Sequence, residues 1–329
     1  MHILVVGGAG YIGSHVCKAL LRDGAQVTVF DNLSSGLKGN IQSGCSFREG
    51  DILDLGALDE VCGAAKFDGV IHLAALKAAG ESMLFPERYS VHNISGTLNL
   101  LNAVTKHHIK HFVFSSSAAV YGDPHYLPMD EKHPTEPANY YGYTKLAIEE
   151  FLSWYRRLKG LKYAALRYFN AAGYDPDGII CGLEQNPANL LPIIMETAMG
   201  WRPKMQVFGN NYETRDGTCI RDYIHVSDLA EAHVIALHNL LEGTASLTVN
   251  LGTGEGITVM EMIRKTEEII GRPLAYDIVA RRVGDPPAVV AASELAKSLL
   301  GWKATRSDLD TLVRTTWKAY QANAKVRIT

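Results

Sequence analysis

Short apolar runs alternate with helical patterns through the first half of the chain. The predicted strands are His2–Val6, Ala25–Phe30, Ser46–Glu49, Val70–Leu73, His111–Ser115 and Lys162–Tyr168, and the helical patterns between them are Tyr11–Asp23, Ala57–Lys66, Pro86–His108 and Ala138–Leu158. Parallel strands need long crossover connections of this kind, and these crossovers are almost always right-handed. The alternation therefore predicts an α/β fold built on a doubly wound parallel sheet.

The character of the sequence changes after Asn170. Gly, Pro and Asn interrupt Ala171–Pro192, and shorter patterns follow: helical at Leu190–Gly200, His225–Leu241, Val259–Gly271 and Leu309–Gln321, and strand-like at Leu247–Leu251 and Ala275–Val279. We expect a nucleotide-binding domain over residues 1–170 and a smaller α/β substrate lobe over residues 171–329. The two are expected to interdigitate, because Leu247–Leu251 could return to the first sheet. Such sheets bind ligands in the crevice at the carboxyl ends of their strands.

Composition narrows the class of protein. The chain has 329 residues, of which 47% are hydrophobic and 20% charged, and this balance is typical of a soluble globular protein. A net charge of −3 argues against nucleic acid or a membrane surface as a partner, and no apolar run approaches the ~20 residues of a membrane span. The five cysteines lack a C-x-x-C pair and the histidines lack metal spacing, so we expect reduced thiols, a cytoplasmic location and no metal site.

A glycine-rich turn follows the first strand. Gly7, Gly10 and Gly13 are spaced Gly-x-x-Gly-x-x-Gly, with Tyr11 and Ile12 opening the helix. Such a turn brings backbone N–H groups of a helix N-terminus close to a pyrophosphate, although a tight strand–helix connection needs glycine as well.

An acidic residue ends the second strand. A carboxylate at Asp31, followed by Asn32, would accept the ribose hydroxyls of a dinucleotide and repel a 2′-phosphate, which favours NAD over NADP. An ordinary turn would also place Asp and Asn here. Two further segments are candidates for the same cofactor: Asp51-Ile52 at the adenine edge, where a plain turn is equally consistent, and the small residues Leu73-Ala74-Ala75 at a strand end.

A possible proton-transfer device lies further along. Tyr141 and Lys145 are four residues apart, so their side chains share one face of the predicted helix, and the triplet Ser115-Ser116-Ser117 ends the strand before it. A tyrosine hydroxyl titrates near ~10, and a nearby ammonium is expected to lower that pKa. A Tyr/Lys pair at helical spacing is usually only a solvated face. The serines and the nucleotide fold favour a device that removes a proton from an alcohol.

Taken in order, these motifs resemble those of the extended short-chain dehydrogenase/reductase family, and within it the UDP-galactose 4-epimerases. The resemblance extends over separated blocks at Gly7–Ser14, Val70–Ser82, Phe114–Gly122, Tyr141–Lys145, Leu166–Gly173, Val207–Gly209, Arg221–Leu229 and Arg281–Asp285. It implies that Tyr141 is the catalytic base, Lys145 its electrostatic partner and a cofactor ligand, and Ser117 the hydroxyl that shares the proton path. It also implies cofactor contacts from Lys77, Asn93, Ser115 and Tyr168.

The same resemblance implies a UDP-sugar substrate. Asn170, Asn189, Arg221 and Arg282 would contact its diphosphate, and Leu190, Val207, Phe208 and Asp285 would frame the uridine. Arginine suits a diphosphate because of its planar donor fork, although Arg221 could simply pair with Asp222. Val289 stands where members narrowly specific for UDP-glucose carry a tyrosine beside carbon 2 of the sugar.

The residues after Ser117 are Ala118 and Ala119. Related dehydratases have Asp-Glu just beyond the serine position and related decarboxylases have Glu, so the resemblance implies only oxidation and re-reduction here. We expect a UDP-glucose/UDP-galactose 4-epimerase that uses bound NAD and, because of Val289, also accepts UDP-GlcNAc/UDP-GalNAc. The alternatives are a UDP-xylose or UDP-glucuronate 4-epimerase, a net NAD-dependent oxidoreductase, or a cofactor-sensing scaffold. Members of the family usually form dimers, so the resemblance also implies a homodimer through the helices at Pro86–His108 and Ala138–Leu158.

Overall fold

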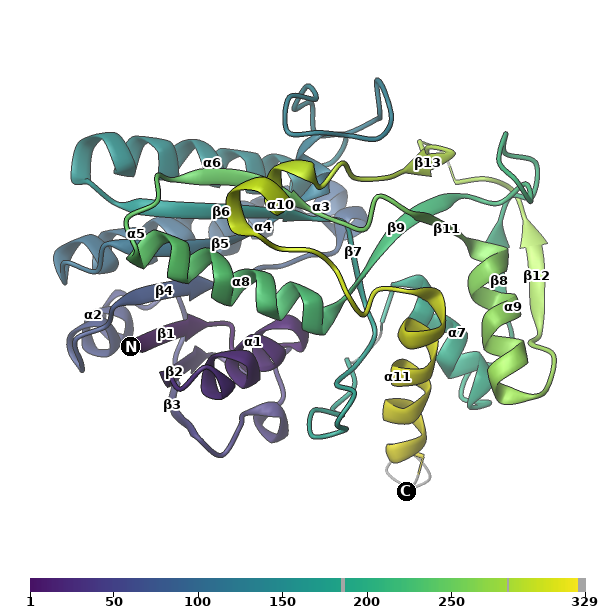
Figure 1. The fold of residues 1–329 in the computed structure, drawn as a ribbon, viewed down its shortest axis with the longest axis horizontal. Helices are drawn as coiled ribbons and strands as arrows, with labels where there is room; N and C mark the ends of the chain where they lie inside the picture. Colours follow the sequence, from purple (N-terminus) through teal and green to yellow (C-terminus); the bar gives the residue numbers. More distant parts are fainter. Residues whose placement is uncertain (185–186, 283, 325–329) are drawn as a thin grey trace.

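A computed structural model describes residues 1–184, 187–282 and 284–324. Within them, seven parallel strands form one sheet, which lies at the centre of the larger lobe in Figure 1. From edge to edge the strands are β10 (Leu247–Leu251), β6 (Lys162–Tyr168), β5 (His111–Ser117), β4 (Gly69–His72), β1 (His2–Val6), β2 (Gln26–Asp31) and β3 (Cys45–Glu49). The predicted doubly wound parallel sheet is confirmed, and every strand expected in the first half is present within two residues of its predicted bounds.

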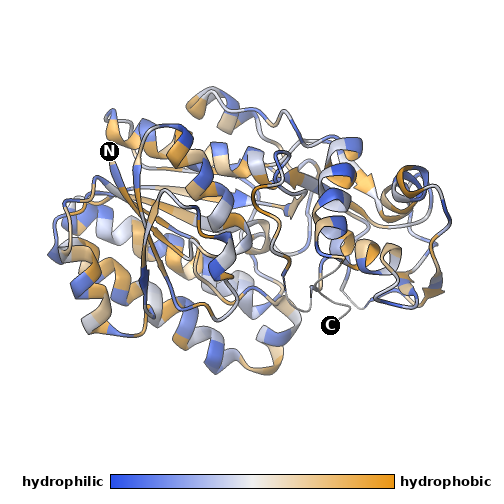
Figure 2. Ribbon diagram, turned by 90° about the horizontal axis from the view of Figure 1, so that it is seen from below, coloured by the Kyte–Doolittle hydropathy of each residue, from blue (hydrophilic) through white to orange (hydrophobic). Residues whose placement is uncertain are grey.

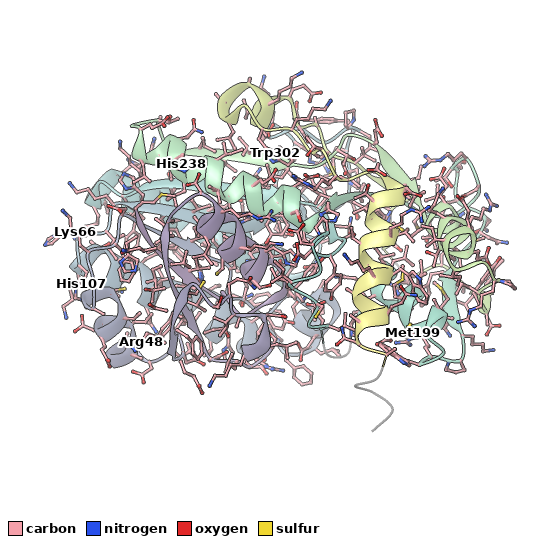
Figure 3. The ribbon with its side chains drawn as sticks, turned by 60° about the horizontal axis from the view of Figure 1, so that its bottom comes forward. Arg48, Lys66, His107, Met199, His238 and Trp302 are labelled. Atoms are coloured by element: carbon pink, nitrogen blue, oxygen red, sulfur yellow. The ribbon has the colours of Figure 1, made fainter. Side chains whose placement is uncertain are left out.

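Helices cover both faces of this sheet. One face packs against α1 (Tyr11–Arg22), α8 (Val226–Leu241) and α10 (Glu294–Leu300), and the other against α2 (Leu55–Gly63), α5 (Gly96–Lys106) and α6 (Tyr140–Lys159). Figure 2 shows apolar residues along the strands and on the helix faces turned toward them, with hydrophilic residues outside. In Figure 3 the charged residues Arg48 and Lys66 lie at the periphery, whereas the Trp302 indole is buried and donates its Nε1–H to the carbonyl oxygen of Asp228 at 3.0 Å.

The chain crosses back to the first sheet after residue 170. β10 pairs in parallel with β6, with Leu251 opposite Tyr168, and α8 packs against α1. An element from the second half of the sequence is therefore an edge strand of the seven-stranded sheet.

The helix predicted at Pro86–His108 is not uniform. It consists of α4 (Pro86–Tyr89), a π-helical segment η2 (Ser90–Ser95) and α5. π-Helical turns interrupt α-helices mostly at functional sites. Here the wider turn contains Asn93, a predicted cofactor contact.

The second lobe has two small sheets. In one, β9 (Ile220–His225) pairs with β7 (Asn170–Ala172), β11 (Gly256–Thr258) and β13 (Ala288–Val289), and in the other β8 (Met205–Phe208) pairs with β12 (Tyr276–Val279). The helices of this lobe are α7 (Leu190–Ala198), α9 (Val259–Ile270) and α11 (Leu309–Ala322), which share a third apolar core with the strands.

The sequence patterns missed several short elements. The strands β7, β8, β9, β11 and β13 were not predicted, nor were α10 and α3 (Ala79–Leu84). Two short 3-10 turns, η1 (Lys38–Asn40) and η3 (Ala118–Val120), complete the set in the described residues. Segments of this length carry little periodicity, so pairing partners decide their conformation.

Candidate active site

The N-terminus of α6 carries Tyr141, and three contacts fix it. Asn139 caps the helix by accepting the Gly142 N–H at 2.9 Å, and the buried Ser82 hydroxyl accepts the Tyr141 N–H at 3.0 Å. A Cβ at Gly142 would lie 2.2 Å from the carbonyl oxygen of Ala119, so glycine lets the helix approach the turn after Ser117. These contacts bring the helix start against the end of β5.

Lys145 lies one turn further along α6 and is 3% exposed. Its ammonium donates to the carbonyl oxygen of Ser115 at 2.7 Å and lies 4.9 Å from the centre of the Phe114 ring and 5.8 Å from that of Tyr141. Burial lowers the pKa of Lys145 to about 7, and the Glu149 carboxylate acts in the opposite direction. The predicted proximity of Tyr141 and Lys145 is therefore observed.

The expected lowering of the Tyr141 pKa is not observed. Burial raises the pKa of Tyr141, and the nearby Ser117 hydroxyl opposes this only in part. The Lys145 ammonium is directed to a backbone carbonyl and not to the phenolic oxygen, which explains why desolvation dominates. Ser117 itself ends β5, and its Oγ accepts the N–H of Ala119 at 3.1 Å.

The glycine-rich turn forms a cradle that side chains would fill. Gly7 has φ +87°, and a Cβ there would lie 2.5 Å from the backbone nitrogen of Ala74. A Cβ at Gly13 would lie 2.1 Å from the carbonyl oxygen of Gly7, whereas Gly10 is less constrained, with a closest contact of 3.3 Å. Gly10 precedes α1, whose first residues are Tyr11 and Ile12. This backbone surface at a helix N-terminus fits a pyrophosphate.

Asp31 lies beside this cradle at the end of β2. It is 8% exposed, and its two carboxylate oxygens accept the N–H groups of Ala9 at 2.9 Å and Leu33 at 2.8 Å. Burial raises its pKa, and these two hydrogen bonds act against the rise. Each oxygen keeps further acceptor capacity, so the geometry fits the predicted ribose contact. Asn32 donates to Asp51 at 2.7 Å, which places both predicted residues at the same edge.

Three predicted cofactor contacts are placed differently from expectation. The Ile52 side chain is buried in the core against α2 and α5, so only its backbone is left for an adenine edge. Asn93 is fully buried and bonds the N–H and C=O of Leu76 at 2.8 and 3.0 Å and Thr144 at 3.1 Å. Lys77 forms an ion pair with Glu184. Asn93 therefore holds the loop of Lys77, and Lys77 must leave Glu184 to reach a cofactor.

The other predicted cofactor residues lie at the carboxyl ends of the strands. The N–H groups of Leu73 and Ala74 bond to the carbonyl oxygen of Val6 at 2.8 and 3.1 Å, and Ala75 follows them, half-buried. The Tyr168 hydroxyl is hydrogen-bonded to that of Ser115. Burial raises the pKa of Tyr168, which keeps this hydroxyl neutral.

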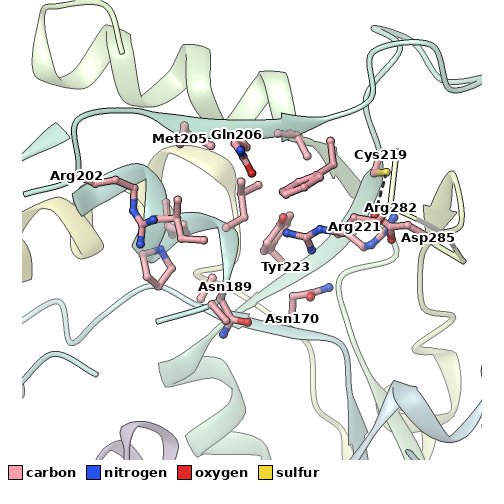
Figure 4. Close-up of a pocket in the computed structure, with 18 of the residues that line it drawn as sticks. Asn170, Asn189, Arg202, Met205, Gln206, Cys219, Arg221, Tyr223, Arg282 and Asp285 are labelled. Carbon is pink, nitrogen blue, oxygen red and sulfur yellow. Dashed lines mark hydrogen bonds and ion pairs between the residues drawn. The ribbon is translucent and has the colours of Figure 1, made fainter. Parts of the chain in front are cut away.

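A cavity of about 610 Å³ opens beyond these residues, in the second lobe. Seven of the predicted substrate residues line it: Asn170, Asn189, Leu190, Phe208, Arg221, Arg282 and Asp285. Figure 4 shows Arg221, Arg282 and Asp285 together at one side and Asn170 and Asn189 below them. The volume falls in the range of small-molecule sites.

Charged groups converge at that side of the cavity. Arg221 forms an ion pair with Asp285 and donates to the carbonyl oxygen of Ile220 at 2.7 Å. The Arg282 guanidinium lies 3.9 Å from the centre of the Phe208 ring. Two guanidinium groups beside the N-terminus of α7 are suited to a diphosphate.

Four predicted substrate residues do not line this cavity: the catalytic candidates Ser117 and Tyr141, and the two valines Val207 and Val289. The Val207 side chain is 1% exposed and belongs to the core of the second lobe, because β8 turns alternate residues inward. Val289 is half-buried in β13, opposite Arg221 in the strand register, and packs with Ala118 and Phe169 against a small apolar cluster.

Sequence reasoning missed several lining residues, among them Gln206, Cys219, Tyr223 and Val259. Tyr223 follows Arg221 by two residues in β9, so recognition of that strand would have placed it on the same face.

Over the described ranges 1–184, 187–282 and 284–324, the structure has no cluster of three His, Cys, Asp or Glu side chains suited to a metal ion. Over those same ranges, no helix is long and apolar enough to cross a membrane.

Comparison with known proteins gives consistent matches. A family model described as "NAD dependent epimerase/dehydratase family" matches residues 3–252. The chain is 46% identical over 318 residues to a UDP-glucose 4-epimerase from Halalkalibacterium halodurans, covering 96% of this chain and 95% of that protein.

Solved structures give the same picture. A UDP-glucose 4-epimerase from Brucella ovis in complex with NAD matches with a TM-score of 0.95 at 44% identity, over 97% of this chain and 98% of that one. A UDP-glucose 4-epimerase from Stenotrophomonas maltophila, with bound NAD and formylated UDP-arabinopyranose, matches with a TM-score of 0.95 at 40% identity, over 99% of each chain.

Proposed function

The chain belongs to the NAD dependent epimerase/dehydratase family, and we propose that it interconverts UDP-glucose and UDP-galactose by transient oxidation at carbon 4 of the sugar. The observation that carries the proposal is the meeting of Ser117, Tyr141 and Lys145 at the carboxyl end of β5, the same edge of the sheet at which the glycine cradle follows β1. The relatives described above are named UDP-glucose 4-epimerases, and NAD is the cofactor of the family.

The glycine cradle of Gly7 and Gly13 would hold the pyrophosphate of NAD, and Asp31 would hold its ribose. When bound, NAD supplies a positive charge and the reversible removal of a hydride from carbon 4, which no side chain of this site can do. The chain's own residues carry out the proton transfer. Tyr141 takes the proton of the 4-hydroxyl, and Ser117 hydrogen-bonds the same oxygen. The Lys145 ammonium, 5.8 Å from the centre of the Tyr141 ring, stabilises the phenolate by its charge and not by a hydrogen bond.

The residues around the diphosphate account for inversion. Arg221, Arg282 and the N-terminus of α7 hold the diphosphate firmly, so the sugar can turn about its phosphate link while it is oxidised. On the catalytic side, Ala118 and Ala119 form a 3-10 turn without acid or base groups, so no elimination of water competes. Tyr141 then returns the proton to the oxygen on carbon 4, and the configuration is inverted because the hydride comes back to the opposite face of that carbon.

The test is turnover of a panel of UDP-sugars, with products resolved by NMR. Tyr141→Phe is expected to lose about 100- to 10,000-fold in turnover because it removes the proton acceptor. Tyr143→Phe is the matched control: Tyr143 lies on the same helix but is 50% exposed, and its turnover should be unchanged. Near-normal turnover by Tyr141→Phe would overturn the assignment. Preferential turnover of UDP-xylose or UDP-glucuronate would select that substrate pair instead, and stoichiometric NADH release would show a net oxidoreductase.

A broader substrate range is a second proposal. Val289 is opposite Arg221 in the strand register, and it packs against the same small apolar cluster as Ala118, which follows Ser117. We infer that it lies near the path from the diphosphate to the catalytic groups. A valine here leaves more room than a tyrosine, so we expect the enzyme also to interconvert UDP-GlcNAc and UDP-GalNAc. Failure to convert UDP-GlcNAc at high enzyme concentration would contradict this.

The exposed apolar face of α3 and α6 supports a homodimer. Met83, Leu84 and Phe85 are 60%, 73% and 49% exposed, and α3 contacts α6, where Trp154 and Leu158 are 52% and 69% exposed. Met83 lies beside the start of α6, where its sulfur accepts the Tyr140 N–H, and Trp154 and Leu158 lie several turns further along the same helix. Groups of exposed apolar side chains mark interaction sites. Light scattering should give twice the chain mass, and Leu84→Asp should reduce it to a monomer. The described cysteines are free thiols, which supports a reducing, cytoplasmic location. Interconversion of UDP-glucose and UDP-galactose would give the enzyme a role in galactose metabolism.

A further inference from the structure

A buried ion pair lies directly beneath the catalytic groups. Glu149 on α6 and Arg167 on β6 are each 7% exposed. The Arg167 Nε lies 2.9 and 3.2 Å from the two carboxylate oxygens of Glu149, and one terminal nitrogen of the guanidinium donates to the same carboxylate at 2.5 Å. The reaction as described above uses neither residue.

The same carboxylate also holds β5. The Ser116 hydroxyl donates to Glu149 Oε1 at 2.5 Å, and Ser116 is the register partner of Arg167 across the two strands. Successive side chains of a strand point to opposite faces. Ser116 and Arg167 therefore face α6 together, and Glu149 joins one helix to two strands.

Each member of this cluster is a neighbour of an active-site residue. Ser116 lies between Ser115 and Ser117, Arg167 precedes Tyr168, and Glu149 follows Lys145 by one helical turn. A displacement of the ion pair is thus transmitted to all three elements that carry the site.

A second set of contacts fixes the guanidinium from the other side. Arg167 donates to the Tyr121 hydroxyl at 3.0 Å, and that hydroxyl donates to Asn250 Oδ1 at 2.6 Å. Asn250 belongs to β10, and its Nδ2 donates to the carbonyl oxygen of Met129 at 2.9 Å. The network therefore extends from α6 across β5 and β6 to the edge strand.

We propose that Glu149 and Arg167 are a positioning pair for the proposed 4-epimerase reaction: they fix the depth of α6 on the sheet, and the Glu149 charge holds Lys145 in its ammonium form. The inference rests on the assignment of Lys145 as the partner of Tyr141. A buried ion pair contributes little net stability compared with well-packed apolar side chains, so stability alone is a weak reason for one at this position.

The charges around Lys145 support the electrostatic part of this role. Lys145 is buried beside the rings of Phe114 and Tyr141, and burial lowers its pKa to about 7. His72 faces it from β4, but burial lowers the pKa of that ring to about 3, so it is neutral. Glu149 raises the pKa of Lys145. The Arg167 guanidinium is bound to the same carboxylate, and a cation paired with an anion offsets part of its field.

Two single substitutions should have opposite effects. Glu149→Gln removes the anion and leaves Arg167 unpaired, so Lys145 should lose its proton about one pH unit or more below the wild-type midpoint. Arg167→Gln leaves the anion unpaired, so the midpoint should rise. Ser116→Ala removes a hydrogen bond to the carboxylate without a change of charge, so its midpoint should stay at the wild-type value.

The measurement is a pH titration of the holoenzyme by NMR, with ¹³C at the lysine Cε and the Lys145→Arg spectrum to identify the resonance. Midpoints that move in the same direction for both variants, or that do not move, would overturn the proposal. If one variant fails to fold, the direction in which the Lys145 midpoint moves in the other variant still decides between the two outcomes. The titration does not depend on turnover, so it is separate from the Tyr141→Phe test of the proposed function.

Steady-state kinetics test the positioning part. Glu149→Gln should lower kcat at least ~10-fold at its best pH, while the KM for the UDP-sugar changes little, because the diphosphate contacts lie in the other lobe. Glu149→Asp keeps the negative charge but shortens the side chain by one methylene group. This variant should therefore keep the wild-type midpoint of Lys145 and still have a lower kcat. An Asp variant with wild-type kcat would show that α6 is not positioned by this pair.

Discussion

Asn93→Ala tests how the loop that carries the cofactor contacts is held. Asn93 lies on the π-helical segment, is fully buried and bonds both the N–H and the C=O of Leu76, at 2.8 and 3.0 Å. Its third bond, at 3.1 Å, is to Thr144, which lies between Tyr141 and Lys145. Removal of the amide therefore frees the loop before Lys77 and loosens the start of α6.

The magnitude follows from the groups left unpaired. A buried N–H or C=O without a partner costs about 1–3 kcal/mol, and Leu76 is half-buried, so the lower part of that range applies to each group. We expect a loss of about 2–3 kcal/mol in the free energy of unfolding, and a melting temperature lower by about 3–4 °C. The fraction of chains that retain NAD should fall, because Leu73–Ala75 lie on the same loop.

Asn99→Ala is the matched control. Asn99 is half-buried on α5, and its amide makes a single bond, to the carbonyl oxygen of Ile52 at 3.2 Å. The Asn99→Ala substitution should lower the free energy of unfolding by no more than about 1 kcal/mol. Thermal unfolding by calorimetry and the NAD released by acid from each purified variant are the two assays. Equal losses of melting temperature for the two variants would refute the argument that Asn93 holds the loop.

Four further outcomes are expected. Gly13→Ala should purify without NAD, measured after acid release, because its Cβ would lie 2.1 Å from the carbonyl oxygen of Gly7. Asp31→Ala should lower NAD occupancy and relax the preference against NADP, measured by calorimetric titration. Val289→Tyr should suppress turnover of UDP-GlcNAc before that of UDP-glucose, and an equal loss for both would contradict the proposed pocket. Burial lowers the pKa of Lys145 to about 7, so between about pH 7 and 10 the unfolded chain binds a proton that the folded chain does not. A Lys145→Met variant should therefore be more stable than wild type below pH 7 and should lose that advantage as the pH rises. Denaturant unfolding at several pH values measures the difference.

The sequence by itself predicted what depends on neighbouring residues. The strands His2–Val6 and Lys162–Tyr168 have their predicted bounds, because apolar β-branched and aromatic runs favour extended backbone locally. The glycine turn was readable because only glycine tolerates the close contacts at Gly7 and Gly13. The shared helix face of Tyr141 and Lys145 follows from helical spacing alone.

Tertiary structure decided what depends on remote partners. The return of β10 to the first sheet, the burial of Val207 and the use of Asn93 as a loop clamp all require knowledge of which segments meet. The raised pKa of Tyr141 has the same origin, because desolvation is set by everything packed around a side chain and outweighs the one lysine that its spacing reveals. The pairing of Glu149 with Arg167 across 18 residues of sequence was likewise invisible until α6 was placed on its strands.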